Sequence, residues 1–487
     1  MKLKILITFL ALWFVGCDDF LEEQSQSEVR PSTVTDMEKI LESDAYFSIA
    51  EGHLFNRKTD IFTDDIQCNL LDYASQKIQK ENERYRFIWD VMMFNDEGGG
   101  QDISFWSVPY ERIKGCNVVL EYIDGMSGDE VKKEHLRGEA YTLRGFYYYM
   151  LVNFFGKPYN HEDPTKSLGV PLKLVTGVTN ERFKRNTVAE CYERIVKDLS
   201  KGTEIMLANK EGASKKSERL KYLAGYALLS RVYLHMEDWD NVIKYCDLVL
   251  EEKSELLDLK NISDGGVYVQ EKTPTEILWQ RNEMKPEWLV MLEPYAVSRD
   301  LVDLYERDVD NQIEDIRGDT KSSPTYIRKS SWGYGWYAGV IKGNASNYWT
   351  NGGIRTAELY LNRAEANIRK YIASGDQEKA RLALADLNEL RKNRFKAGYA
   401  DKQLTDFTNG EDLLEFCLRE RRRELCAEAN HRWFDLRRLG MPELKHVYID
   451  DDNGRETEYV LYKNDSRYVL PIPAEVIRRN PNLRESE

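Results

Sequence analysis

The chain has 487 residues, of which 31% are charged, and its formal net charge at pH 7 is −14. A chain of this length can bury a large core, either as one big domain or as a few small ones. Its acidic balance argues against nucleic acid and anionic lipid as partners, because both carry negative charge.

The first residues have the pattern of a bacterial lipoprotein signal. Lys2 and Lys4 precede an apolar run over residues 5–15, and Cys17 follows shortly after it. The run is far shorter than the ~20 apolar residues of a membrane-spanning helix. We therefore interpret residues 1–16 as a cleaved signal and Cys17 as the lipidated residue.

The signal sets the expected domain organisation. Residues 17–35 form a lipidated tether, and residues 36–487 form a single domain held at the membrane by its lipid. An ordinary signal peptide is the alternative, since Phe14 stands where the usual lipobox has leucine. Removal of the two lysines with the signal takes the formal charge from −14 to −16.

A long helix is predicted near the end of the first third of the chain. Apolar residues recur there at alternating steps of four and three, which places them on one face of a helix that stops at Gly156. A helix from about Val108 to Ile123 precedes it, so the region 106–156 reads as a helical hairpin. The apolar positions of the second helix are Leu136, Ala140, Leu143, Tyr147, Met150 and Phe154.

Two further helical regions, about 188–252 and 355–438, resemble tetratricopeptide (TPR) units. Ala224 and Ala227 give the first region a stripe of small residues that lets two helices approach closely. In the second region Gly375-Asp376 predicts the turn between two antiparallel helices. More than a hundred residues separate the two, which argues against a simple solenoid.

Two irregular, aromatic segments, about 55–105 and 255–352, interrupt the helical pattern. The second holds five of the ten tryptophans: Trp279, Trp288, Trp332, Trp336 and Trp349. Since binding residues concentrate on loops held by rigid elements, we expect these segments to face the ligand and to meet in one surface. The predicted fold class is mainly α: TPR-like antiparallel helix pairs form a scaffold that carries long irregular insertions and a few short β-hairpins.

One hairpin is predicted late in the chain. Tyr448-Ile449 and residues 459–462 flank an acidic run that ends in Asn453-Gly454, a common turn pair. The run lacks the alternate acidic spacing of a calcium loop.

No metal, cofactor or catalytic centre is predicted. The six cysteines after Cys17 are scattered without metal-ligand spacing, so we expect buried free thiols. Glu420 and Glu424 stand in a helix beside several arginines, which would keep both carboxylates ionised and unable to act as general acids. We interpret this helix as scaffold and the protein as a non-enzyme.

A glycan site needs exposed rings that stack on sugar C–H faces, beside short polar side chains that bind hydroxyls. The glycines at 333 and 335 make the cluster from Trp332 to Tyr337 the best candidate. The alternative is core packing, which we expect for Trp106, Trp239, Trp279 and Trp433. The full candidate set is Trp332, Tyr334, Trp336, Tyr337, Trp288 and Tyr295 from the second segment and Trp89, Asp64, Asp65 and Asn95 from the first.

Taken in order, the motifs resemble the SusD/RagB family over nearly the whole chain. Beside Cys17 and the TPR-like segment they are Trp106 with Tyr110, Ile113 and Asn117; Glu139-Ala140-Tyr141; Arg144-Gly145-Phe146; Gly169-Val170-Pro171-Leu172; Leu361-Asn362-Arg363-Ala364-Glu365-Ala366; Glu420-Arg421-Arg422-Arg423-Glu424; Arg432-Trp433-Phe434-Asp435-Leu436-Arg437-Arg438; Leu470-Pro471-Ile472-Pro473; and Asn480-Pro481-Asn482-Leu483.

The resemblance implies a lipoprotein on the cell surface that captures glycans. It would act as the lid of a SusC-like, TonB-dependent outer-membrane transporter. Ligand residues vary within the family, so only Cys17 is carried over by position. The rival functions are peptide capture within the same family, a TPR-type adaptor, and a glycoside hydrolase, for which no acid motif is present.

Overall fold

The computed structural model describes residues 31–47, 59–70, 74–95, 102–177, 182–261, 275–284, 294–308, 313–318, 327–329, 338–340, 349–396, 399–450 and 453–484. The predicted signal, Cys17 and most of the tether lie outside the described residues. So do Trp288 and the cluster from Trp332 to Tyr337.

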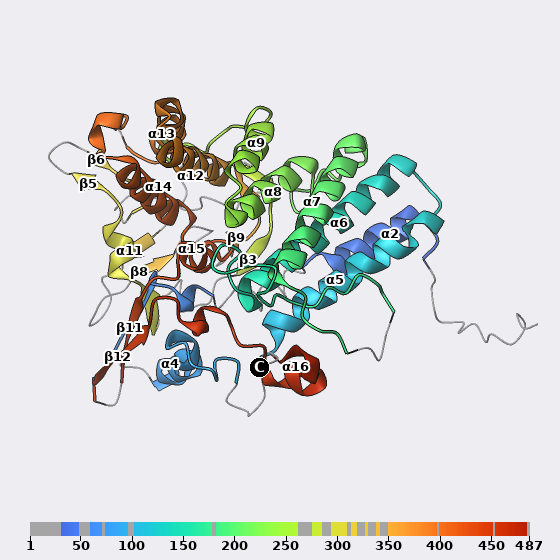
Figure 1. The fold of residues 1–487 in the computed structure, drawn as a ribbon, viewed down its shortest axis with the longest axis horizontal. Coiled ribbons are helices and arrows are strands. Elements are labelled where there is room, and N and C mark those ends of the chain that lie inside the picture. Colours follow the sequence, from blue (N-terminus) through green and yellow to red (C-terminus); the bar gives the residue numbers. More distant parts are fainter. Residues whose placement is uncertain are drawn as a thin grey trace, which may run out of the picture.

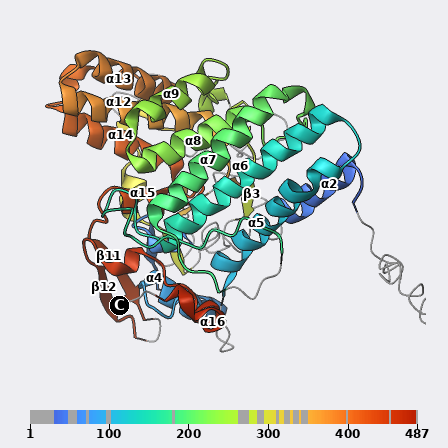
Figure 2. The same ribbon diagram turned by 45° about the vertical axis from the view of Figure 1, so that its right-hand side comes forward.

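A row of packed helices forms the scaffold, and the mainly α fold class is confirmed. Each helix packs against the next, and α9 packs against α12. Figure 1 shows the row curving across the molecule, and Figure 2 shows α6, α7 and α8 side by side. The row contains α5 (Ser104–Tyr122), α6 (Glu130–Phe155), α7 (Val188–Ala208), α8 (Tyr222–Met236), α9 (Trp239–Leu250), α12 (Thr356–Ser374), α13 (Gln377–Lys392) and α14 (Gly410–Leu425).

The row is continuous in space although the chain leaves it between Leu250 and Thr356. The repeats that lie far apart in sequence therefore stack directly, through the contact of α9 with α12. The array is still not a simple solenoid, as expected from the sequence, because the chain leaves the row between α9 and α12. The long excursion is an insertion into the row and not a gap in it.

Local signals explain where the helices start and stop. Gly375 ends α12 in the left-handed conformation, with φ +73°, and the Asp376 side chain caps α13 by accepting from the Glu378 amide. Thr187 and Glu190 form a capping box at the start of α7. A polar cap of this kind stabilises a helix by about 1 kcal/mol.

Glycines set the distance between α6 and α7. A Cβ atom on Gly202 would lie 2.3 Å from Thr142 Oγ1 and 2.6 Å from the Gly138 carbonyl oxygen. Only hydrogen fits there, so the two helix backbones approach more closely than larger side chains would allow.

Shorter elements fill the other side of the molecule. In Figure 1, α4 and the hairpin β11–β12 lie on the side opposite α9 and α13. The helical ones are α2 (Val34–Ile40) with the π-turn η2 (Leu41–Ala45), η3 (Asp60–Phe62), α4 (Ala74–Phe87), η4 (Ile123–Gly125), η5 (Lys210–Gly212), η6 (Leu259–Asn261), α11 (Arg299–Asp303), η7 (Leu404–Asp406), α15 (His431–Arg438), η8 (Ser466–Tyr468), α16 (Ala474–Arg479) and η9 (Pro481–Leu483).

The helix α4 corrects the expectation of an irregular segment over residues 55–105. Its sequence carries few apolar residues, so no hydrophobic stripe announces it. It is rich in glutamine, lysine, glutamate and arginine, all of which have high helix propensity. Propensity rather than periodicity was the signal there.

The strands pair two by two. The predicted late hairpin is confirmed as β11 (Leu444–Ile449) with β12 (Glu456–Leu461). Its connection spans residues 450–455 and contains the predicted pair Asn453-Gly454, of which Gly454 has φ +64°. The other pairs are β1 (Ile66–Cys68) with β4 (Tyr295–Val297), β2 (Ile277–Trp279) with β10 (Ile354–Arg355), β3 (Asn282–Met284) with β9 (Trp349–Asn351), β5 (Arg307–Asp308) with β6 (Ile313–Glu314), and β7 (Ile327–Lys329) with β8 (Ala338–Val340).

One large hydrophobic cluster joins the helical row to the other side, and a smaller one lies between α12, α13 and α14. Trp106, Trp279 and Trp433 are buried as predicted, while Trp239 is partly buried at the edge. The six predicted free cysteines are all buried. Among the described helices, none combines the length and the apolar character needed to cross a membrane.

Candidate functional site

The two irregular segments meet, as predicted, through the strand pair β1–β4. The strands run antiparallel, with Ile66 opposite Val297 and Cys68 opposite Tyr295. Two backbone hydrogen bonds extend the junction: the Asn69 amide donates to the Pro294 carbonyl at 2.8 Å, and the Ser298 amide donates to the Asp65 carbonyl at 2.7 Å. Residues more than 200 positions apart thus pair in one small sheet, most of whose side chains are buried.

Trp89 and Tyr295 were predicted to bind ligand, and the structure corrects this prediction. Both side chains lie inside the junction and hold it together. Both side chains are 0% exposed. Trp89 Nε1 donates to the Phe62 carbonyl at 2.9 Å, and its ring stacks on His446 at 4.1 Å. The Tyr295 hydroxyl donates to the Lys80 carbonyl at 2.8 Å. Neither ring is open to a sugar, because each is enclosed where the two segments pack.

The predicted acids Asp64 and Asp65 tie the first segment to the charged helices. Arg432 donates to both oxygens of Asp64, at 2.8 and 2.6 Å, and Arg422 Nε donates to Asp65 Oδ1 at 2.7 Å. Burial alone would raise the pKa of Asp64, but Arg432 and Arg422 outweigh it and lower this pKa to about 2. Burial, together with neighbouring Asp64, raises the pKa of Asp65. Asn95 lies in the same segment and is partly exposed.

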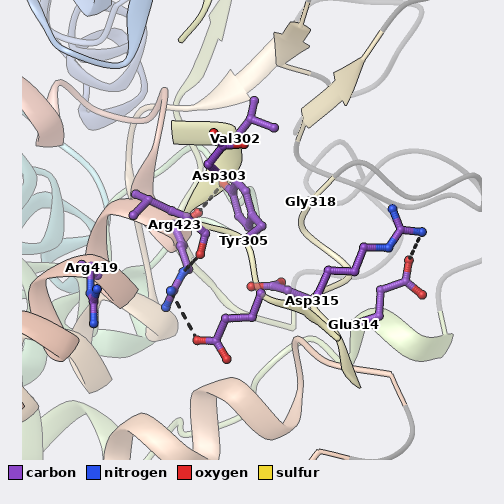
Figure 3. A pocket seen from close by; sticks show the side chains of 11 residues that line it. Val302, Asp303, Tyr305, Glu314, Asp315, Gly318, Arg419 and Arg423 are labelled. Carbon is purple, nitrogen blue, oxygen red and sulfur yellow. Dashed lines mark hydrogen bonds and ion pairs between the residues drawn. The ribbon is translucent and has the colours of Figure 1, made fainter. Parts of the chain in front are cut away.

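A pocket of about 460 Å³ opens beside the junction, between α11, the β5–β6 pair and α14 (Figure 3). Val302 and Tyr305 are its buried walls. Arg307 and Arg419 stand at its mouth with side chains 57% and 48% exposed. Guanidinium groups beside carboxylates and an aromatic wall are suited to bind the hydroxyls of a polar ligand.

A cluster of buried ion pairs adjoins this pocket, because Arg317 of the cluster pairs with the lining residue Asp315 at 2.7 Å. Glu424 accepts hydrogen bonds from Arg317, Arg355 and Arg394, and Glu276 also pairs with the last two. Glu276 and Arg317 belong to the excursion, whereas Glu424 belongs to α14. The cluster therefore fixes the excursion to the scaffold.

The same cluster bears on catalysis. Burial would raise the pKa of Glu420 and of Glu424, but the surrounding arginines lower both pKa values below the usual carboxyl range. This confirms the prediction that both carboxylates stay ionised. A carboxylate with a lowered pKa is a poor general acid, so the helix serves as scaffold.

The pocket residues were missed by the sequence reasoning. Tyr305, Arg307 and Glu314 fall in the predicted ligand-facing segment, where their only signal was position in a region without helical periodicity. Arg419 lies in α14, within the predicted helical region 355–438, and had no such signal. Within the described ranges, no group of three or more histidines, cysteines and carboxylates is arranged to hold a metal ion.

Comparison with known proteins finds two family models and a relative that match this chain. A family model described as starch-binding and associating with the outer membrane matches residues 19–234, and the SusD family model matches residues 272–486. SusD-like protein P2 of Formosa agariphila is 23% identical, over 99% of this chain and 98% of its own length.

Solved structures agree on the fold. A SusD-like carbohydrate binding protein from Bacteroides vulgatus is 18% identical, with a TM-score of 0.67 over 93% of this chain and 97% of that one. A SusD superfamily protein from Bacteroides thetaiotaomicron is 20% identical, with a TM-score of 0.67 over 93% and 99%. Since the two family models together match most of the chain, over residues 19–234 and 272–486, the chain belongs to the SusD/RagB family.

Proposed function

We propose that this protein is a cell-surface lipoprotein that captures glycans and delivers them, as a lid, to a TonB-dependent outer-membrane transporter. Anchoring is assigned to Cys17 and ligand capture to the surface built on the β1–β4 junction. The protein binds its ligand without chemical conversion.

The observation that carries the proposal is the mounting of the two aromatic segments on one rigid support. The β1–β4 pair joins them, the Asp64–Arg432 ion pair holds the first, and the Glu424 cluster holds the second. A binding surface gains affinity when its loops are ordered before the ligand arrives, because less conformational entropy is lost. Family membership supports the choice of glycan, since one matching family model is described as starch-binding and a solved structure of the same fold is named a carbohydrate binding protein.

The candidate contacts divide into two groups. Trp332, Tyr334, Trp336, Tyr337 and Trp288 are proposed as stacking rings; they lie outside the described residues. Asn95, Arg307 and Arg419 are proposed as hydroxyl ligands on the described surface.

Calorimetry of the chain lacking residues 1–17, against a panel of oligosaccharides, polysaccharides and peptides, tests the proposal. We expect a glycan to bind, and the double variant W332A/W336A to lose that binding. Loss of a ring–sugar stack is expected to weaken affinity by at least about tenfold. The matched control is Y122A, which removes a ring that is 51% exposed at the end of α5, on the scaffold.

Each rival function has its own signature. Binding of peptides alone would replace glycan capture by peptide capture. An adaptor would bind neither class and would pull down a protein through its helical row. Release of reducing sugar ends during long incubation with a bound glycan would overturn the non-enzymatic assignment.

A further inference from the structure

A groove beside the C-terminal segment has a charge opposite in sign to that of the whole chain. Two cavities, of about 490 and 260 Å³, continue into one another there, since Arg185, Ser466 and Val469 line both. The other basic residues of the lining are Lys157, Lys166 and Arg484.

The acids in the groove leave its floor positive. Glu162 and Asp163 are the acidic residues of the lining, and each pairs with one lysine, at 2.7 and 3.2 Å. Both pairs are exposed to solvent, so they are weak and a bound anion can replace the carboxylate. Arg185 donates to the carbonyl oxygens of Phe155 and Gly169, which hold its guanidinium group in the lining.

The rim adds further cations. Asn480 Nδ2 donates to the Phe183 carbonyl at 2.8 Å, which packs the end of α16 against the segment that contains Arg182 and Lys184. These two side chains and Arg484 are exposed, and none of the three has an ion-pair partner within the described part of the chain.

The charges of the two sequence stretches that border the groove also sum to a positive value. This count includes residues beyond those that the structure describes. Residues 181–185 and 475–487 carry six arginines and lysines and four glutamates, a balance of +2. The whole chain has a net charge of −14. The groove is therefore a local reversal of a repulsive field, which is the arrangement that draws an anionic ligand to one place.

We propose that this groove is a second glycan contact, separate from the aromatic excursion, which takes acidic polysaccharides. Carboxylate or sulfate groups along the polymer pair with Lys157, Lys166 and Arg484. Pro471 and Ile472 offer apolar surface to sugar C–H faces, and Ser466 offers a hydroxyl. A hollow groove suits an extended polymer chain and excludes a flat layer of lipid headgroups. The inference rests on the proposed function only in taking the ligand to be a glycan.

The test compares acidic and neutral polymers on the chain lacking residues 1–17. Polygalacturonate and dextran sulfate are the acidic probes, dextran is the neutral one, and vesicles of anionic phospholipid are the membrane probe. The variant is R484E. The control is R381E, which reverses an arginine 62% exposed on α13, beside a different cavity.

We expect binding to the acidic polymers that weakens with salt, and a further loss of at least about tenfold in R484E, the effect of one hydrogen bond to a charged group. R381E should bind like the unchanged protein. Because the net charge of −14 repels polyanions elsewhere on the surface, this binding reports on the groove.

Three results would overturn the inference: equal binding of acidic polymers and dextran, equal effects of R484E and R381E, or Arg484-dependent binding to vesicles without binding to polymers. The W332A/W336A variant separates the two proposals. It should keep the groove's binding of acidic polymers even if the aromatic surface proves not to bind glycans.

Discussion

Replacing Glu424 with glutamine removes one negative charge from the centre of a buried cluster while keeping the side-chain volume. The Glu424 side chain is fully buried. Its Oε1 accepts from Arg355 at 2.6 Å and from Arg394 at 2.9 Å. Its Oε2 accepts from Arg317 at 2.9 Å and again from Arg394 at 3.0 Å. Four charge-assisted hydrogen bonds from three guanidinium groups thus depend on one carboxylate.

The loss in free energy of unfolding depends on which acidic partners the three arginines keep in E424Q. Removing one partner of a buried ion pair costs about 3–5 kcal/mol, because the other charge stays buried. In E424Q, Arg355 and Arg394 keep Glu276, and Arg317 keeps Asp315 and Glu420. The loss is therefore shared, and we expect the free energy of unfolding to fall by about 3–5 kcal/mol rather than by a multiple of it.

Urea unfolding followed by tryptophan fluorescence measures this loss. The control is E378Q, which breaks an exposed ion pair of Glu378 with Arg381 at 2.8 Å. A pair of that kind contributes at most about 1 kcal/mol. Limited proteolysis should also cut E424Q first within residues 255–352, since the cluster fixes that excursion to α14. Unfolding of E424Q at the same urea concentration as E378Q would refute the argument that the cluster holds the excursion.

Three further predictions concern packing and pH. G202A should lower the free energy of unfolding by about 1–3 kcal/mol through overpacking against Thr142, and the companion T142A, by removing that hydroxyl, should recover part of the loss in urea unfolding. D64N should lower the urea midpoint by an amount that is constant from pH 7 to about 4 and becomes smaller below pH 4. The reason is that the ion pair with Arg432 lowers the pKa of Asp64 from 3.8 to about 2, so the pair is lost as the carboxylate is protonated. A difference between D64N and the unchanged protein that grows on acidification would contradict this. Burial lowers the pKa of His446 from 6.5 to about 4. As the pH drops from 6.5 to 4, the histidine is therefore protonated in the unfolded chain before it is in the folded one, and the free energy of unfolding falls. H446Q should lose less stability over that range, and an equal loss in H446Q and the unchanged protein would count against a buried neutral ring.

Local pattern was enough for much of the scaffold. The four-and-three spacing predicted the helix that the structure has as α6, and Gly375-Asp376 predicted the turn between α12 and α13. Such signals act between residues three or four apart, so neighbours in sequence carry them completely. The helix α4 was not predicted, because its apolar residues are too few to form a hydrophobic stripe.

The candidate site was predictable only in outline. The sequence indicated that two aromatic segments would meet, and the β1–β4 pair confirms it. It could not show which rings are enclosed: Tyr295 binds Lys80 across 215 residues, and Arg432 binds Asp64 across 368. Nor did it reveal the pocket at Arg307 and Arg419, whose members share no local pattern.

The sequence by itself determined the helical periodicity, the turn signals, the scattered spacing of the cysteines and the family motifs. Only the tertiary structure decided that Trp89 and Tyr295 are buried, that the helical row is continuous, and that a basic groove lies beside α16 in an acidic protein. Burial and local charge depend on which distant side chains come into contact, and these contacts exist only once the chain has folded.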